Sequence, residues 1–186
     1  DEKFWRGLER ERVWDTVLAQ SHPIGGLPIG LGARDTLRVE AGLRLYGTDM
    51  DTTTTPLEVG LDWTVAINKP SFIGKDVLVR QKQEGVKKKF VGFELAGGPV
   101  PRTGAELLVD GRKVGVVTSG TFSPILNKPL GMGSVAPAYA KVGTVLSLTV
   151  RSQHYQATVV KLPFWKPEMK PAAIGATIAA QLEKLS

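Results

Sequence analysis

The sequence of 186 residues contains no cysteine, and this absence excludes two kinds of site. Without thiols the protein can form neither a disulfide framework nor a thiolate-ligated metal centre. Histidine is also scarce, because His22 and His154 are the only two and lie far apart in the chain. A zinc site or a Ser-His-Asp triad needs histidines that meet other ligands, so we predict neither a metal site nor such a triad.

A long apolar run is missing as well. No stretch approaches the roughly 20 apolar residues that a membrane-spanning helix needs, so we expect no membrane partner. The first residues, Asp1, Glu2 and Lys3, show neither an initiator methionine nor the charged-then-apolar pattern of a secretory leader. We therefore expect that the N-terminal part of the protein's own chain is missing. We also expect the protein to work in the bacterial cytoplasm or the mitochondrial matrix.

Positive charge is in excess, with 24 Lys and Arg against 18 Asp and Glu and a net charge of +6. This balance favours an anionic partner. The one dense cationic run, residues 87–89, is short, and a solvated face explains it as well as an anion site does. Aromatic residues are only 7% of the chain, and they form no evident stacking array for nucleic acid.

The first half of the chain has a helical pattern. Apolar residues recur at three- to four-residue intervals over residues 3–20, which predicts an amphipathic helix. Glycines and prolines follow, and a shorter helix is predicted over residues 33–43, with Gly42 near its end. A third helix is predicted over residues 75–84, with Gly85 as its C-terminal cap.

From residue 90 onward, short β-like runs separated by turn residues replace the helical pattern. The pair Asp110-Gly111 between two of these runs is a strong signal for a β-hairpin. Six strands at this spacing are typical of a small antiparallel barrel or sandwich, so the predicted fold class is α+β. The expected strands are residues 90–95, 106–109, 114–119, 130–135, 145–150 and 156–162.

Three groups of residues carry a resemblance to a known family. Residues 30–47 read GLGARDTLRVEAGLRLYG, residues 55–58 and 72–75 read TPLE and FIGK, and residues 118–124 read TSGTFSP. In order and spacing they resemble the glycine cleavage T-protein (aminomethyltransferase) family. The similarity runs from about residue 28 to about residue 165, so it covers most of the chain.

The resemblance implies a fold and a division into domains. Family members form a three-lobed ring with tetrahydrofolate in a central channel and a C-terminal β-barrel lobe. Residues 1–85 are then the C-terminal part of the folate-binding lobe, and residues 86–165 are the antiparallel β-barrel domain. Residues 166–186 are a tail, for which apolar spacing over residues 172–185 predicts a helix. We interpret residues 118–124 as a structural turn between two strands that faces the folate lobe.

The resemblance also implies an activity. In the glycine cleavage system, the T-protein converts the aminomethyl group carried on the lipoyl arm of the H-protein to ammonia and 5,10-methylenetetrahydrofolate. The expected cofactor is therefore tetrahydrofolate, and the expected partner is the lipoylated H-protein. The chain would be an aminomethyltransferase of one-carbon metabolism and glycine catabolism.

Two residues are candidates for folate binding. A pterin presents adjacent N3–H and 2-amino donors, which one carboxylate can accept together. Glu40 lies where the family's pterin-reading glutamate sits. Lys69, after Trp63, is the nearest match to the family's basic residue for the carboxylates of the folate tail. It lacks arginine's bidentate fork, and a solvated loop lysine explains it equally well.

No residue of this chain is expected to be catalytic. In the family, an aspartate near the folate N5 atom comes from the N-terminal half, and no residue here matches its position. Electrostatic stabilisation of developing charge needs a placed carboxylate, so we expect the isolated chain to be inactive.

Two other interpretations remain open. Related folate-binding modules serve demethylases and enzymes of dimethylglycine and sarcosine, and a direct assay separates these from a T-protein. A basic barrel that binds nucleic acid is a different class, which the net charge allows. Salt-sensitive binding of an oligonucleotide without any response to folate would favour that class.

Overall fold

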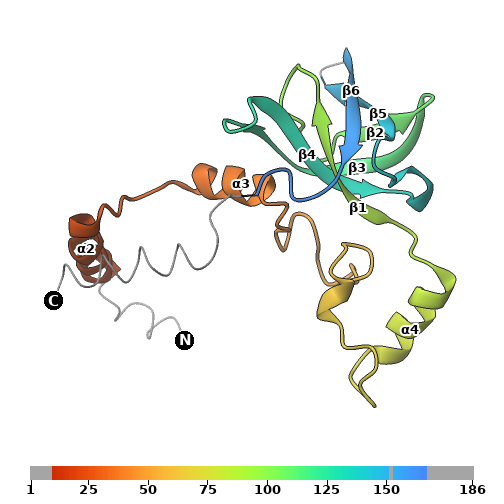
Figure 1. Ribbon diagram of the computed structural model, residues 1–186, viewed down its shortest axis with the longest axis horizontal. Coiled ribbons are helices and arrows are strands. Elements are labelled where there is room, and N and C mark those ends of the chain that lie inside the picture. The colour runs from red at the N-terminus through yellow and green to blue at the C-terminus, as the bar shows by residue number, and fades with distance from the viewer. Residues whose placement is uncertain (1–9, 151–152, 167–186) are drawn as a thin grey trace. The chain divides into compact units, whose positions relative to one another are not determined.

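The computed structural model describes residues 10–150 and 153–166 of the chain (Figure 1). The described residues form two compact units, residues 10–33 and residues 34–166. All of the strands and the candidate site belong to the second unit.

The first unit contains the helix α2 (Arg10–Ser21). It confirms the helix predicted over residues 3–20 from residue 10 onward. The earlier residues of that helix lie outside the described residues, as does the tail helix predicted over residues 172–185. Among the described residues, the short 3-10 helices are η1 (His22–Ile24), η2 (Asp62–Thr64) and η3 (Pro137–Tyr139).

The second unit is built around a closed antiparallel β-barrel (Figure 1). Its strands are hydrogen-bonded in the order β1-β4-β3-β2-β5-β6, and β6 pairs with β1 to close the barrel. The α+β class and the antiparallel barrel predicted from the sequence are therefore confirmed. The strands are β1 (Lys89–Leu95), β2 (Glu106–Val109), β3 (Arg112–Ser123), β4 (Lys128–Val135), β5 (Val145–Val150) and β6 (Gln153–Val160).

The barrel is filled by apolar side chains that alternate along the strands. Phe93 and Leu95 of β1 pack with Leu107, Leu148 and Val159 from three other strands, and all five are buried. Burying a side chain of this size contributes about 1.5–3 kcal/mol. The barrel core alone therefore gives the second unit a firm hydrophobic centre.

The turn between β2 and β3 is the hairpin predicted from the sequence. Val109 pairs with Arg112, and Asp110 and Gly111 between them have φ angles of 49° and 74°. Positive φ at both central residues defines a type I′ turn, whose twist matches that of the flanking strands. The turn therefore sets the pairing of Val109 with Arg112 and of Leu108 with Lys113, and a register shift follows between Leu108 and Leu107.

Strand β3 is longer than predicted. The sequence predicts a strand over residues 114–119 and a turn over residues 118–124, but β3 runs on to Ser123, which pairs with Lys128 of β4. Pro124 then offers no N–H donor to continue the ladder. The predicted turn is therefore wrong for residues up to Ser123, because these small polar residues belong to the strand.

Gly120 has a steric role in this strand, so the prediction that turn geometry explains it is wrong. A Cβ added to Gly120 would lie 2.1 Å from the carbonyl oxygen of Pro101, a backbone atom that cannot rotate away. We expect Gly120→Ala to lower the free energy of unfolding by about 1–3 kcal/mol through overpacking, as measured by urea denaturation. At Gly97 an added Cβ meets no atom within 4 Å. Gly97→Ala is the control, and an equal effect of both variants would contradict the steric role.

The helix α3 (Leu31–Glu40) confirms the second predicted helix and ends in a Schellman motif. The N–H of Gly42 donates to the carbonyl oxygen of Val39, and the N–H of Leu43 donates to that of Arg38, both at 2.8 Å. Gly42 has a φ of 64°, a conformation that glycine adopts without a steric penalty. The motif ends the helix directly after Glu40, the candidate folate-binding residue.

The helix α4 (Lys75–Glu84) has the predicted bounds and is capped by Gly85 as predicted. Next to it, the N–H of Thr55 donates to Glu58 Oε2 at 2.9 Å, as in a capping box. The Thr55 hydroxyl donates to Gln81 Oε1 of α4 at 2.7 Å. The TPLE stretch therefore has a structural role, joining its own turn to α4.

Candidate functional site

Glu40, the predicted pterin-reading residue, is the last residue of α3 and is buried, with 1% of its surface exposed. Its carbonyl oxygen accepts a hydrogen bond from the backbone N–H of Trp165 at 3.1 Å. Its carboxylate oxygen Oε1 accepts a hydrogen bond from Ser123 Oγ at 2.5 Å. Glu40 is therefore held at both its backbone and its side chain.

The surroundings of this helix end are apolar. Val39, the neighbour of Glu40 in the chain, forms a buried cluster with Leu130 and Met132 of β4. Leu162 and Phe164, from the segment after β6, pack against the same cluster. A carboxylate removed from water is unfavourable unless hydrogen bonds replace its hydration. Glu40 is therefore suited to meet hydrogen-bond donors.

Three hydroxyl side chains of β3 face α3 and the loop after it. Ser119, Thr121 and Ser123 are spaced two residues apart, so they lie on one face of the strand. Ser123 bonds to Glu40, and the Thr121 hydroxyl lies 3.0 Å from the hydroxyl of Thr36 on α3. Residues of the stretch 118–124 therefore contact α3, as expected, and the assignment of α3 to a folate lobe stays a prediction.

Asp49 is the centre of a second buried polar cluster, with its side chain 0% exposed. Its Oδ2 atom accepts from Arg38 Nη1 at 2.5 Å and from the N–H of Leu45 at 2.9 Å. Its Oδ1 atom accepts from Thr118 Oγ1 at 2.5 Å and from Ser119 Oγ at 2.7 Å. The carboxylate thus has donors on both oxygens, and these come from α3, the following loop and the barrel.

A β-bulge allows two successive residues of β3 to reach the same carboxylate. Successive side chains of a regular strand point to opposite faces. The register of β3 on β4 shifts between Val117, which pairs with Gly133, and Ser119, which pairs with Met132. Thr118 is the extra residue, and a bulge redirects its side chain. The hydroxyls of Thr118 and Ser119 can therefore both donate to one aspartate.

Arg38 links this cluster to the helix that carries Glu40. Its Nη2 atom donates to Ser119 Oγ at 2.9 Å, and its Nε atom donates to Asp35 Oδ1 at 2.8 Å. Its side chain is only 11% exposed. Because Arg38 and Glu40 lie on the same last turn of α3, the cluster helps to fix the position of Glu40.

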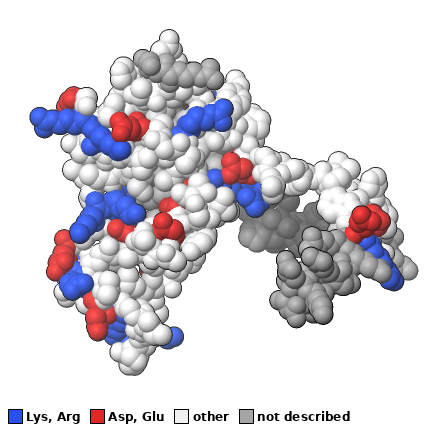
Figure 2. Space-filling model, turned by 180° about the vertical axis from the view of Figure 1, so that it is seen from behind, with Lys and Arg blue, Asp and Glu red and all other residues white. Residues whose placement is uncertain are grey.

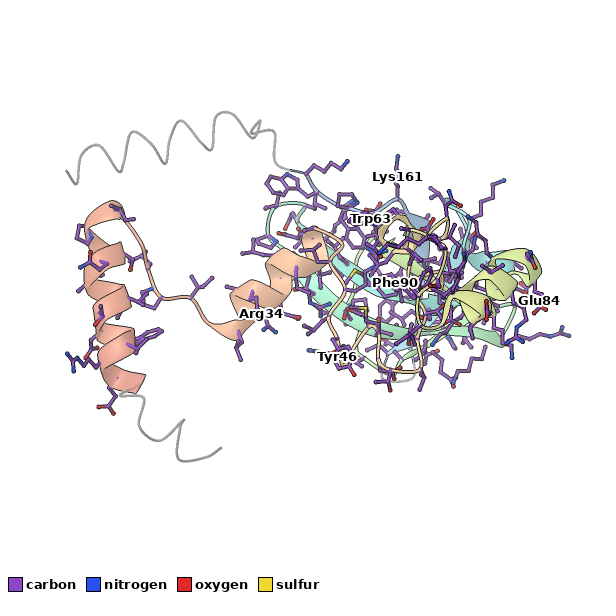
Figure 3. The ribbon with its side chains drawn as sticks, turned by 90° about the horizontal axis from the view of Figure 1, so that it is seen from below. Arg34, Tyr46, Trp63, Glu84, Phe90 and Lys161 are labelled. Carbon is purple, nitrogen blue, oxygen red and sulfur yellow. The ribbon has the colours of Figure 1, made fainter. Side chains whose placement is uncertain are left out.

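Arg44 fixes the loop after α3 on the first strand of the barrel. Its guanidinium lies 4.9 Å from the ring centroid of Phe90, which is labelled in Figure 3, in a cation–π contact. Its Nη1 atom donates to the carbonyl oxygen of Gly42 at 2.9 Å, while its buried Nε atom has no hydrogen-bond partner among the described residues. Burial lowers the pKa of the Arg44 guanidinium, and the carboxylate of Asp49 opposes that change.

Lys69 is exposed, in the turn before α4. Its carbonyl oxygen accepts a hydrogen bond from Lys75 Nζ at 2.5 Å. Within the described part of the chain, the Lys69 side chain makes no hydrogen bond or ion pair with the protein. Trp63, on η2, is 79% exposed and labelled in Figure 3. None of these contacts joins Lys69 to Glu40, so its role at the folate tail stays a prediction.

Asp51 accepts two hydrogen bonds from Thr53, from the hydroxyl at 2.7 Å and from the backbone N–H at 2.8 Å. These bonds, the hydroxyl first, lower the pKa of the Asp51 carboxyl. A lowered folded-state pKa gives stability that is present above the unfolded-state pKa and is lost as pH falls through the folded-state pKa. We expect Thr53→Ala to raise the Asp51 pKa toward its ordinary value in an NMR titration, and an unchanged value would contradict this cause.

Two kinds of site are absent from the residues that the structure describes. No group of three or more His, Cys, Asp or Glu that could hold a metal ion occurs in residues 10–150 and 153–166. None of the helices described there is long and apolar enough to cross a membrane.

On the face shown in Figure 2, Lys and Arg side chains lie beside Asp and Glu side chains. The charge on that face is therefore mixed.

Sequence reasoning proposed Glu40 as a site residue but missed the residues that hold it. Asp49 and Ser123 are buried polar residues, and neither is a candidate from motif spacing alone. One signal could have found Ser123, because small hydroxyl residues repeat with a period of two in the stretch TSGTFS. That period is typical of one face of a strand.

Comparisons with known families agree with the barrel and with the segment before it. Residues 88–166 match the family model described as the glycine cleavage T-protein C-terminal barrel domain. Residues 5–69 match the model described as the GCVT N-terminal domain. The class of protein is therefore a chain in which a segment similar to the GCVT N-terminal domain precedes a T-protein C-terminal barrel domain.

Individual proteins with similar sequences are aminomethyltransferases. An aminomethyltransferase of Desulforamulus reducens is 44% identical over 168 residues, which are 90% of this chain and 46% of that protein. An aminomethyltransferase of Bacteroides fragilis is 48% identical over 157 residues, which are 83% of this chain and 44% of that protein. The chain belongs to the glycine cleavage T-protein family. It spans less than half the length of these curated relatives.

A solved structure supports the fold. The crystal structure of glycine cleavage system aminomethyltransferase T from Bartonella henselae is similar with a TM-score of 0.71 and 37% sequence identity. The similar region covers 74% of this chain and 39% of that chain. Most of this chain therefore adopts a fold already known in the family.

Proposed function

We propose that this chain forms the folate-reading part of a tetrahydrofolate-dependent aminomethyltransferase of the glycine cleavage system. The observation that supports it best is the buried carboxylate of Glu40, in the RVEAG stretch that resembles the family's pterin-reading segment. Membership of the T-protein family supports the type of reaction. The substrate would be the aminomethyl-lipoyl group of the H-protein, and the products 5,10-methylenetetrahydrofolate and ammonia.

The residues present fit the recognition of a pterin. The ring N3–H and the 2-amino group are adjacent donors, and an ionised carboxylate offers acceptor positions on both oxygens. Ser123 occupies one acceptor position of Glu40 Oε1, which leaves the others for a ligand. When bound, tetrahydrofolate supplies the nitrogen atoms that take up the one-carbon unit. In this proposal Glu40 binds and orients the pterin edge, and Lys69 contributes a cation for the carboxylates of the tail.

We propose that the catalytic carboxylate comes from a part of the protein outside these 186 residues. The three aspartates within residues 35–51 already have partners within the chain. Asp35 bonds to Arg38, Asp49 bonds to four donors, and Asp51 bonds to Thr53. The chain would then supply binding and positioning, and by itself would not turn over. In this proposal the complete protein works in the bacterial cytoplasm or the mitochondrial matrix.

A titration with tetrahydrofolate tests this proposal. Trp165 donates its backbone N–H to Glu40, so its indole fluorescence is a suitable reporter of binding near that residue. We expect saturable binding to the 186-residue chain. A second assay adds aminomethyl-loaded, lipoylated H-protein to the chain joined to the remaining length of its family, and measures ammonia.

The outcomes separate the competing functions. Ammonia release that needs both the H-protein and tetrahydrofolate would support the aminomethyltransferase. Transfer of a methyl group from dimethylglycine or sarcosine would assign the chain to a related folate-dependent module. Oligonucleotide binding that weakens steeply with salt, without any response to folate, would favour a nucleic-acid-binding barrel.

A further inference from the structure

Ser123 occupies a distinctive position at the end of β3. It is 0% exposed, and its backbone pairs with Lys128 at the last rung of the β3–β4 ladder. Its hydroxyl oxygen lies 2.5 Å from Glu40 Oε1 and 3.0 Å from the backbone nitrogen of Leu126. The barrel thus places one small polar side chain directly against the candidate pterin reader.

The two contacts fix the direction of the Ser123 proton. A serine hydroxyl has one proton to donate and two lone pairs that accept. The N–H of Leu126 can only donate, so it occupies a lone pair of the Ser123 oxygen. The single hydroxyl proton is then directed to Glu40 Oε1. The turn after β3 therefore sets Ser123 as a donor to Glu40.

Glu40 needs such an anchor because its side chain has three rotatable bonds. Its backbone is fixed by the Schellman motif and by the N–H of Trp165, but neither contact restrains the carboxylate. Among the described residues, the carboxylate has one protein donor, Ser123. Ser123 therefore determines the direction in which the second oxygen can accept a ligand's donors.

We propose that Ser123 is a positioning residue through which the barrel domain orients Glu40 for reading the two adjacent donors of a pterin edge. The proposal rests on the proposed function, since it assigns Ser123 to the same folate site. A residue in this role affects recognition of the pterin edge and leaves recognition of the folate tail unchanged. A residue that only stabilises the fold would affect both alike.

Ser123→Ala tests the proposal, with Thr121→Val as the matched control. Thr121 also places a hydroxyl of β3 against α3, but its partner is Thr36 and not Glu40. We expect Ser123→Ala to weaken tetrahydrofolate binding to the 186-residue chain by about tenfold, in line with the loss of a hydrogen bond to a charged group. We expect p-aminobenzoyl-glutamate, which lacks the pterin, to bind both variants as it binds the wild type.

A second measurement does not depend on any ligand. In a chain with ¹³C-labelled glutamate carboxyl groups, the resonance of Glu40 is the one that Glu40→Gln removes. We expect Ser123→Ala to shift this resonance and Thr121→Val to leave it in place. An unmoved resonance in Ser123→Ala would overturn the proposal, whether or not folate binds.

The binding measurements distinguish a positioning role of Ser123 from a purely structural one. Equal weakening in the two variants, or equal weakening for the two ligands, would show a structural role and overturn the proposal. Tetrahydrofolate affinity unchanged by Ser123→Ala would overturn it while leaving the folate function intact. A wild-type chain that binds no tetrahydrofolate would remove the folate-reading role proposed for this chain, and the positioning role would fall with it even if the resonance moves.

Discussion

Replacing Asp49 by alanine is expected to lower the free energy of unfolding by about 3–5 kcal/mol, the usual cost of removing one partner from a buried ion pair. Asp49 is completely buried and accepts from four donors, and Arg38 is nearly buried beside it. Without the carboxylate, the guanidinium and the hydroxyls of Thr118 and Ser119 lose their acceptor in a site that water reaches poorly. Urea denaturation, followed by far-UV circular dichroism, measures the loss.

Asp51→Ala is the matched control for this prediction. It removes the same side chain two positions further along the same loop, where the carboxylate is exposed and bonds only to nearby threonines. We expect little change in stability for Asp51→Ala. If the two variants had similar stabilities, the Asp49 cluster would not be a main link between α3 and the barrel.

The same cluster shows why part of the site could not be read from the sequence. Asp49 bonds to hydroxyls 69 and 70 residues further along the chain. No periodicity or local motif encodes a contact of that separation, and the bulge that brings Thr118 and Ser119 to one side is itself a product of pairing with β4. From the sequence, an aspartate in a polar loop is expected to be exposed to solvent. In the folded protein, the contacts with the barrel bury Asp49.

Local signals did predict much of the barrel. The short β-like runs between turn residues predicted all six strands, and Asp110-Gly111 predicted the hairpin between β2 and β3. The strand order and the closure of β6 on β1 depend on pairings between distant segments, which local runs do not specify. Residues up to Ser123 were mistaken for a turn because small polar residues and glycine are typical of turns. In the structure, the Ser123 hydroxyl bonds to Glu40 of α3, and Gly120 leaves room for the carbonyl oxygen of Pro101.

Glu40 was predicted by resemblance, and its burial adds a physical reason. From the sequence alone, a glutamate at the end of a helix beside arginines is most often a weak surface ion pair. In the structure Arg38 pairs with Asp35 and Asp49 instead, which leaves Glu40 to a neutral serine. The carboxylate therefore keeps its capacity to accept from a ligand.

Glu40→Gln is expected to weaken tetrahydrofolate binding by roughly 100-fold or more, because two hydrogen bonds to a charged acceptor are lost. Glutamine keeps the volume of the side chain, and its carbonyl oxygen can still accept from Ser123, so the fold should remain intact. Its amide NH₂ group would then face the donors of the pterin, and two donors cannot satisfy each other. Isothermal calorimetry, with circular dichroism to confirm folding, measures the change.

Glu58→Gln supplies the matched control, since Glu58 is also a buried glutamate but accepts from Thr55 in its own turn. We expect it to leave tetrahydrofolate affinity unchanged, even if stability falls. Equal affinities of the wild type and Glu40→Gln would exclude Glu40 as the pterin reader. A comparable loss in both variants would instead mean that the titration reports general loosening of the chain. Loss confined to Glu40→Gln would tie pterin recognition to the one carboxylate that α3 buries against the barrel.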